Sequence, residues 1–266
     1  MDWWWAYLVL GGFVGFFSGL LGIGGGSVMV PILTFIFAGK QLAPTHVVHI
    51  ALGTGMATIL FTSAASVVSH HRHRAVNWRI LRDLAPGVVV GTFCGALLAG
   101  YLSRVVLGVL FAAIVYFNAT QLLLDINPKA DRGLPGTAGM WFAGSVIGAL
   151  SSLAALAGAS LTVPFLVRRN VRMHEAIGTA AAVGWPLSFA GTLGYVVSGI
   201  GADGLPEHSV GFVYLPAVFW IVIASVIMAP LGARVAHRTR AGVLKRIFAV
   251  LLYALATRML WSLLTG

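Results

Sequence analysis

Long apolar blocks follow one another along the chain, separated by short polar loops. About 20 apolar residues make a helix that crosses the hydrocarbon core of a bilayer, because a helix rises about 1.5 Å per residue through about 30 Å. Only 9% of the 266 residues are charged, whereas a soluble domain carries roughly 25%. So few charges could not solvate a core of this size. The blocks therefore predict an all-α polytopic membrane protein surrounded by a lipid bilayer.

The net charge of +10 would suggest a nucleic-acid partner if the chain were soluble. In a membrane protein such an excess is typical of cytoplasmic loops, and no aromatic and basic platform or recognition helix accompanies it. We therefore expect no nucleic-acid partner. The single cysteine, Cys94, leaves no disulfide framework and no thiolate metal site. The tract HHRHR at 70–74 indicates a cytoplasmic patch, so we expect no metal site.

The two halves of the sequence repeat each other. Residues 15–33 read GFFSGLLGIGGGSVMVPIL, and residues 148–166 read GALSSLAALAGASLTVPFL. One constant shift, from 15 to 148, aligns the two stretches. The aligned pairs are Gly15 with Gly148, Gly25 with Gly158, Ser27 with Ser160, and Pro31 with Pro164. A stretch that repeats at this distance predicts two copies of one structural unit.

A second stretch repeats in the same order. HIALGTGM at 49–56 matches HEAIGTAA at 174–181. The aligned pairs are His49 with His174, Gly53 with Gly178, and Thr54 with Thr179. Each half therefore contains one long interrupted apolar segment followed by three ordinary spans. The expected segments are 6–39, 47–69, 84–103 and 105–124, then 138–167, 174–198, 211–236 and 243–263.

The segment DINPKADRGLPGT at 125–137 is polar and rich in proline and glycine, so we interpret it as the cytoplasmic linker. The predicted units are a first membrane repeat at 1–124, this linker, and a second membrane repeat at 138–266.

Two hairpins explain where the basic residues lie. If 6–39 and 138–167 each enter and leave on one side, the basic loops all face the cytoplasm, as the positive-inside rule requires. Those loops are 70–82, 125–137, 168–173 and 234–246, and they hold 14 of the 17 basic residues. Full crossings would scatter positive charge over both faces. The predicted fold is two inverted repeats, each an interrupted, hairpin-like helix plus three transmembrane helices.

The glycine-rich interruption predicts an anion site. Glycine lets the backbone turn and lets a ligand approach, and we expect Ser27 to cap the helix that follows, with Pro31 in its first turn. A helix N-terminus inside the membrane points free amides and the positive dipole end at an anion. Inversion would bring the second break opposite the first. The expected substrate-binding residues are Gly24, Gly25, Gly26, Ser27, Thr54, Gly158, Ala159, Ser160 and Thr179.

Other interpretations of these residues stay open. The glycines could serve helix packing alone. His49 and His174 could relay a proton for coupled transport or lie at the headgroup level. A membrane-embedded hydrolase would need a base beside Ser27 or Ser160, and no histidine lies centrally in a span. We therefore expect no enzyme.

The set of motifs resembles the TauE/SafE family of sulfite exporters and anion permeases. The features that carry the resemblance are the GxGGGxxxxP break, its degenerate second copy, the repeated Gly-Thr spans and the stretch HHRHRAVNWRILRDLAPGVVVGTFCGALLA at 70–99. The resemblance implies a multi-pass transporter of the bacterial inner membrane that exports sulfite or a sulfonate such as sulfoacetate, without a bound cofactor. The alternatives are a passive anion channel and a transporter of another small organic anion. Assembly as a homo-oligomer is left open.

Overall fold

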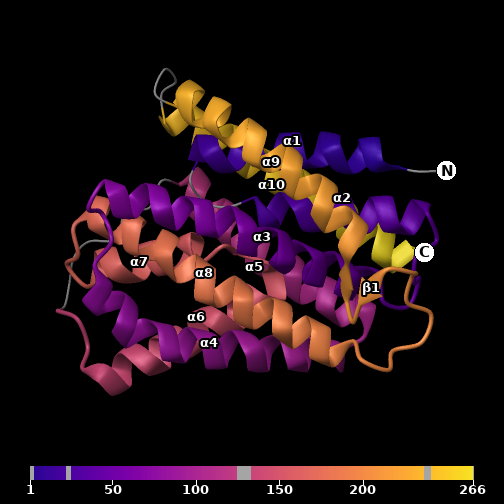
Figure 1. Ribbon diagram of the computed structural model, residues 1–266, viewed down its shortest axis with the longest axis horizontal. Helices are drawn as coiled ribbons and strands as arrows, with labels where there is room; N and C mark the ends of the chain where they lie inside the picture. The colour runs from indigo at the N-terminus through magenta and orange to yellow at the C-terminus, as the bar shows by residue number, and fades with distance from the viewer. Residues whose placement is uncertain (1–2, 22–24, 125–132, 237–240, 266) are drawn as a thin grey trace.

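The computed structural model describes residues 3–21, 25–124, 133–236 and 241–265, and Figure 1 shows them as a bundle of helices. The helices of the first half are α1 (Trp4–Leu21), α2 (Gly26–Gly39), α3 (Val47–Arg72), α4 (Trp78–Gly100) and α5 (Arg104–Leu123). Those of the second half are α6 (Thr137–Ala154), α7 (Ala159–Arg168), α8 (Met173–Ser198), α9 (Leu215–Ala236) and α10 (Ala241–Thr265). A two-residue hairpin of β1 (Ser209–Val210) and β2 (Val213–Tyr214) precedes α9. The prediction of an all-α membrane fold is confirmed.

Helices α3 and α8 form the centre of the bundle. Of the α3 span 78% is buried and of the α8 span 61%, against 28% for α9. The two helices pack antiparallel: Gly53, near the start of α3, contacts Tyr195 near the end of α8, while Gly178, near the start of α8, contacts Ala75 just past the end of α3. Side chains on these two helices therefore have access to the interior between the halves.

Each predicted interrupted segment consists of two helices. The Nζ atom of Lys40, at the end of α2, lies 6.0 Å from the ring centroid of Trp3 and 5.4 Å from that of Tyr7. The end of α2 therefore lies beside the start of α1, so the two helices run antiparallel. In the second half Ala155 ends α6 with φ 46°, and Gly158 starts α7 with φ 73°. These left-handed residues reverse the chain.

One detail of the predicted break is wrong. Gly25, and not Ser27, is the N-cap of α2, and its place is taken in the second half by Gly158. Ser27 is the second residue of α2, and Pro31 is the sixth, beyond the first turn. Serine is favoured at an N-cap, but close packing at this point of the chain admits only glycine, as described below.

Glycines bring α1 against α9 and α4 against α6. A Cβ atom at Gly15 would lie 2.5 Å from the Cα atom of Ser225, and one at Gly91 would lie 2.0 Å from the carbonyl oxygen of Ser145. Small residues four apart let membrane helices approach to backbone contact. The stripes are Gly11, Gly15 and Gly19 on α1, and Gly87, Gly91 and Gly95 on α4. The first helix of each half thus packs on the fourth helix of the other half.

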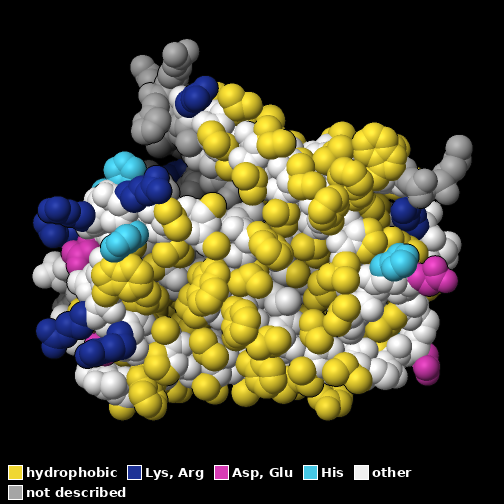
Figure 2. All heavy atoms as spheres, viewed as in Figure 1, with side chains coloured by type: hydrophobic (Ala, Val, Ile, Leu, Met, Phe, Trp, Pro, Cys, Tyr) yellow, Lys and Arg dark blue, Asp and Glu magenta, His cyan; other side chains and the backbone are white. Residues whose placement is uncertain are grey.

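The surface is banded. Figure 2 shows an apolar belt between two ends that carry the charged side chains, with Lys and Arg gathered at the left end. In the described part of the chain, seven helices are long and apolar enough to cross a membrane. We call the end with the loops 73–77 and 169–172 the arginine-rich end; Lys40 lies at the opposite end. The protein is therefore a multi-pass membrane protein.

Candidate functional site

The first break is glycine because nothing larger fits. A Cβ atom at Gly25 would lie 2.1 Å from Cγ1 of Val14, and one at Gly26 would lie 1.9 Å from the carbonyl oxygen of Ala155. Gly25 offers no side chain to cap α2, so the first-turn amides have no side-chain acceptor. Gly24 lies outside the described residues.

The second break has the same plan with different residues. Gly158 caps α7 without a side chain, and its left-handed φ of 73° favours glycine. A Cβ atom there would lie 3.3 Å from the carbonyl oxygen of Ala180 in α8. Ala159 is buried and begins α7, and Ser160 is half-buried. Both uncapped helix N-termini thus begin in the interior of the protein.

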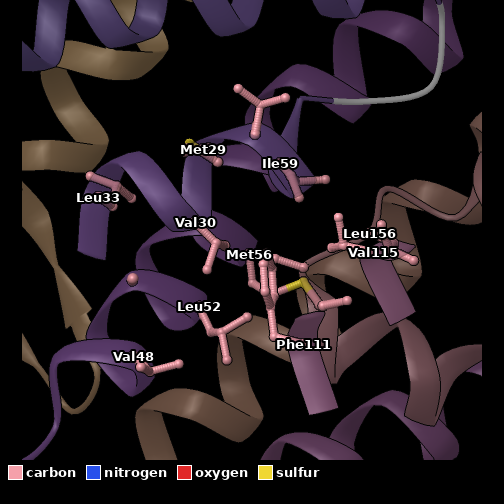
Figure 3. Packing of buried hydrophobic residues seen from close by; sticks show 14 of the residues in the cluster. Met29, Val30, Leu33, Val48, Leu52, Met56, Ile59, Phe111, Val115 and Leu156 are labelled. Atoms are coloured by element: carbon pink, nitrogen blue, oxygen red, sulfur yellow. The ribbon is translucent and has the colours of Figure 1, made fainter. Parts of the chain in front are cut away.

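The two breaks meet against the central helices. Gly26 of α2 contacts Ala155 of the second break, and Ala155 also lies against Gly55 in the middle of α3. Helix α2 starts inside a dense apolar core, where Figure 3 shows Met29 and Val30 beside Met56 and Ile59 of α3. Two helix N-termini therefore lie in the same region of low polarity, where their dipoles would act on an anion with little screening.

Buried hydroxyls accompany the breaks. Ser27 is 3% exposed, and Ser151 and Thr162 are fully buried. Among the residues that the structure describes, Oγ of Ser151 and Oγ1 of Thr162 have no hydrogen-bond partner, an arrangement that is costly and uncommon in folded proteins. Ser151 lies in the last turn of α6 and Thr162 in the first turn of α7, so both flank the second break. These hydroxyls are suited to donate to a bound oxyanion.

The sequence interpretation missed Ser151 and Thr162. A signal for Ser151 was present, because the shift that pairs Ser27 with Ser160 also pairs Ser18 with Ser151. Thr162 had no such signal, since Met29 is its counterpart.

A second pair of hydroxyls lies between the central helices. Oγ of Ser63 in α3 lies 3.4 Å from Oγ of Ser188 in α8, and both residues are buried. The shift that pairs His49 with His174 also pairs these serines. Ser63 is close to the breaks as well, because a Cβ atom at Gly184 would lie 3.6 Å from the Cβ atom of Ser63 and 3.1 Å from the carbonyl oxygen of Ala157.

The Gly-Thr motifs have matching contacts of their own. Oγ1 of Thr54 accepts the amide N–H of Tyr214 at 3.0 Å, and Oγ1 of Thr179 accepts that of Asn77 at 2.9 Å. Each threonine follows a glycine. A Cβ atom at Gly53 would lie 2.3 Å from the carbonyl oxygen of Phe212, and one at Gly178 would lie 2.4 Å from the carbonyl oxygen of Ala75. Each motif thus fixes the segment that leads into the fourth helix of the other half. The structure gives both threonines a structural contact, and a role for them in anion binding stays a prediction.

The two paired histidines have different surroundings. His49 is 1% exposed, so it does not face lipid headgroups, and its Nε2–H donates to the carbonyl oxygens of Ala99 and Leu102, each at 3.0 Å. Carbonyl oxygens only accept, so Nε2 carries the proton. His174 is exposed at the arginine-rich end. A proton-coupling role for either stays a prediction.

Apolar spans, buried helix breaks and a duplicated bundle define a polytopic membrane transporter. The comparisons with known proteins agree with this class and narrow it. The family model for the sulfite exporter TauE/SafE matches residues 7–259, so the chain belongs to this family.

Relatives of the chain carry the same general description. A probable membrane transporter protein of Haemophilus influenzae is 35% identical over 257 residues, which cover 95% of this chain and 96% of the relative. A probable membrane transporter protein of Methanocaldococcus jannaschii is 24% identical, covering 86% of this chain and 84% of its own length. No solved structure matches the chain.

Proposed function

We propose that the protein exports a small sulfur-containing anion, sulfite or an organosulfonate such as sulfoacetate, as a secondary transporter. The anion binds near the midplane between the N-termini of α2 and α7. The observation that carries this proposal is the contact between the two breaks, in which Gly26 abuts Ala155. That contact places two uncapped helix N-termini in one buried region, which is the arrangement that many secondary transporters use for anionic groups.

The residues of the site have complementary roles in this proposal. Backbone amides at Gly25, Gly26 and Ser160 donate to the anion, and Ser27 adds a hydroxyl from the first break. Ala159 lines the site at the start of α7, where its own amide donates to the carbonyl oxygen of Ala157 at 2.8 Å. The unpartnered hydroxyls of Ser151 and Thr162 supply two further donors. Oxyanions accept several such bonds at once, and bonds to a charged acceptor are about twice as strong as neutral ones. The family name supports sulfite or a sulfonate as the anion.

We also propose that the halves are inverted repeats that alternate access to this site. The reciprocal packing of α1 on α9 and of α6 on α4 supports the proposal, because exchange of the two halves maps one contact onto the other. The antiparallel pair of α3 and α8, with Ser63 beside Ser188, lies where the axis relating the halves would pass. A rocking motion about this pair would open the site to each side in turn.

Uptake of radiolabelled sulfite into proteoliposomes of the purified protein tests the proposal. Sulfoacetate, thiosulfate and sulfate serve as competitors, and a pH gradient is imposed in either direction. We expect saturable uptake that the gradient changes and that a sulfonate inhibits. Flux that follows the anion gradient without saturation would instead indicate a channel. No uptake of any sulfur anion by folded protein would overturn the substrate assignment.

A further inference from the structure

A polar cleft opens at the arginine-rich end, away from the helix breaks. Its volume is about 410 Å³, and its lining comes from the loop between α3 and α4 and from the start of α8. The residues that line it are Arg74, Val76, Asn77 and Trp78 from the first half, and Arg172, His174 and Glu175 from the second. The cleft therefore lies between the two halves.

The cations of the cleft are only partly neutralised. Nε of Arg172 lies 3.6 Å from Oε2 of Glu175, and the side-chain amide of Asn77 donates to Oε1 of the same carboxylate. Both carboxylate oxygens of Glu175 thus have partners. Arg74 forms no ion pair with any described residue. Its guanidinium offers donors in the planar arrangement that sulfonate and other oxyanions accept.

Arg74 occupies a position that usually belongs to glycine. The amide of Arg74 donates to the carbonyl oxygen of His71, and that of Ala75 donates to His70, which is the pattern of a Schellman turn. Arg74 takes the left-handed conformation with φ 54°, and an L side chain there costs roughly 1–2 kcal/mol. A residue kept at that cost, with its side chain in a cleft, is a candidate for ligand binding.

Asn77 links the lining of the cleft to the starts of α4 and α8 through three hydrogen bonds. Its amide donates to Thr179 in α8, while its side-chain oxygen accepts the amides of Arg79 and Ile80 at the start of α4. The N-termini of α4 and α8 both reach the cleft, and that of α8 has no side-chain cap. Both positive dipole ends add to the field of the arginines.

We infer that this cleft is a second anion site, which receives a small sulfonate or sulfur oxyanion at the arginine-rich end before the anion reaches the helix breaks. The inference rests on the proposed function for the identity of the anion, but binding at the cleft is measurable without transport. Arg74 and Arg172 bind the anionic group. Asn77 and Glu175 position Arg172 and the start of α4.

Thiol labelling of the full-length purified protein in detergent tests the site. Val76→Cys in a Cys94→Ala background places the single thiol in the cleft. The probes are 2-sulfonatoethyl methanethiosulfonate, itself an organosulfonate, and its cationic trimethylammonium counterpart. Ile200→Cys, 73% exposed in the loop with Asp203 and Glu207, is the reference thiol. We expect the anionic-to-cationic rate ratio at Val76→Cys to exceed the reference by about tenfold, because clefts of one charge raise association rates by about 10 to 1,000 times.

Two further experiments distinguish a binding site from a general electrostatic attraction of anions to the arginine-rich end. Arg74→Ala and Arg172→Ala should each lower the ratio severalfold, whereas Arg82→Ala, which removes an exposed arginine of the same end, should leave it within twofold. Sulfoacetate should slow labelling at Val76→Cys more than chloride of equal ionic strength does. This last experiment needs no arginine substitution, so it decides the matter even if those variants do not fold.

Equal ratios at the two thiols, an equal effect of Arg82→Ala, or no protection by sulfoacetate would overturn the inference. Sulfite flux is measured on the same preparation. Failure of the anion site can therefore be told apart from failure of the proposed transport. Protection without flux would remove the proposed transport and keep the anion site. Flux without protection would remove the anion site and keep the transport.

Discussion

Ser63 and Ser188 lie with their Oγ atoms 3.4 Å apart between α3 and α8. They come from equivalent places in the two halves, and each is buried. The hydroxyl of Ser188 also donates within its own helix, with Gly184 at 2.8 Å and Trp185 at 3.0 Å as acceptors. The pair is therefore a weak bridge between the two central helices, one from each half.

The first prediction concerns the strength of this bridge. Ser63→Ala and Ser188→Ala should couple by about 0.6 kcal/mol in a double-mutant cycle, the usual value for a hydrogen bond between membrane helices. The measurement is unfolding in mixed micelles of the two single variants and the double variant. A coupling energy of zero would show that the two hydroxyls do not interact. Ser145→Ala, whose hydroxyl bonds only within α6, is the control and should show no coupling with Ser188→Ala.

The second prediction compares two glycines of the same helix. Gly26→Ala should destabilise the fold by about 1–3 kcal/mol and abolish transport, because the added Cβ would lie 1.9 Å from the carbonyl oxygen of Ala155 and separate the two breaks. Gly39→Ala meets nothing within 4 Å and should be neutral in both assays. Thermal unfolding and sulfite flux are measured on both variants. Flux in Gly26→Ala equal to that of the wild type would contradict the proposed contact between the breaks.

The third prediction assigns a structural role to Thr179. Thr179→Val removes the acceptor of the Asn77 amide and should cost about 1–3 kcal/mol, since a part-buried donor is left unsatisfied. Thr179→Ser keeps the oxygen and should recover most of this loss. Unfolding free energies of the two variants check the difference. If Thr179→Val lowered affinity for the anion while stability stayed constant, the hydroxyl of Thr179 would act on the substrate as the sequence predicts.

Much of the fold could be predicted from the sequence because its signals are local. The apolar blocks and the GIGGG interruption specify helices and a break regardless of what packs around them. The cap of α2 could not be predicted in this way. Choosing Gly25 over Ser27 depends on Val14 and Ala155, which approach the break only in the folded chain.

The candidate site shows the same division. Ser27, Ser160 and the Gly-Thr pairs could be proposed from the sequence, because a repeat is recognised by aligning the two halves of the chain. Arg74 and Arg172, from opposite halves, line one cleft at the arginine-rich end, and neither the repeat nor the charge pattern indicates that they share it. Ser151 and Thr162 were missed for a related reason: an unpartnered hydroxyl is recognised only when all of its neighbours are known.

The fourth prediction tests the first break. Ser27→Ala should raise the dissociation constant or KM for sulfite by about tenfold, because a hydrogen bond to a charged group contributes roughly 1.5–3 kcal/mol. Stability should change by less than 1 kcal/mol, since alanine suits the second position of α2 and fills nearly the same volume. Binding is measured by sulfite-dependent thermal stabilisation and KM by proteoliposome flux. Unchanged affinity in the folded variant would remove Ser27 from the site.

The last prediction concerns the unpartnered hydroxyl of Ser151. Without substrate, Ser151→Ala should be neutral or more stable by up to about 1 kcal/mol, because a fully buried hydroxyl with no partner is replaced by a methyl group. With sulfite present the order should reverse, since the wild type then gains a donor to the anion and the variant does not. Ser152→Ala is the matched control, because the hydroxyl of Ser152 already donates to the carbonyl oxygen of Ala149 at 2.8 Å. The difference in stability between this variant and the wild type should keep the same sign with and without sulfite. Unfolding midpoints of the three proteins, with and without sulfite, distinguish the cases. A Ser151→Ala variant that is stabilised by sulfite as much as the wild type would exclude this hydroxyl from the anion site and leave its burial without a functional explanation.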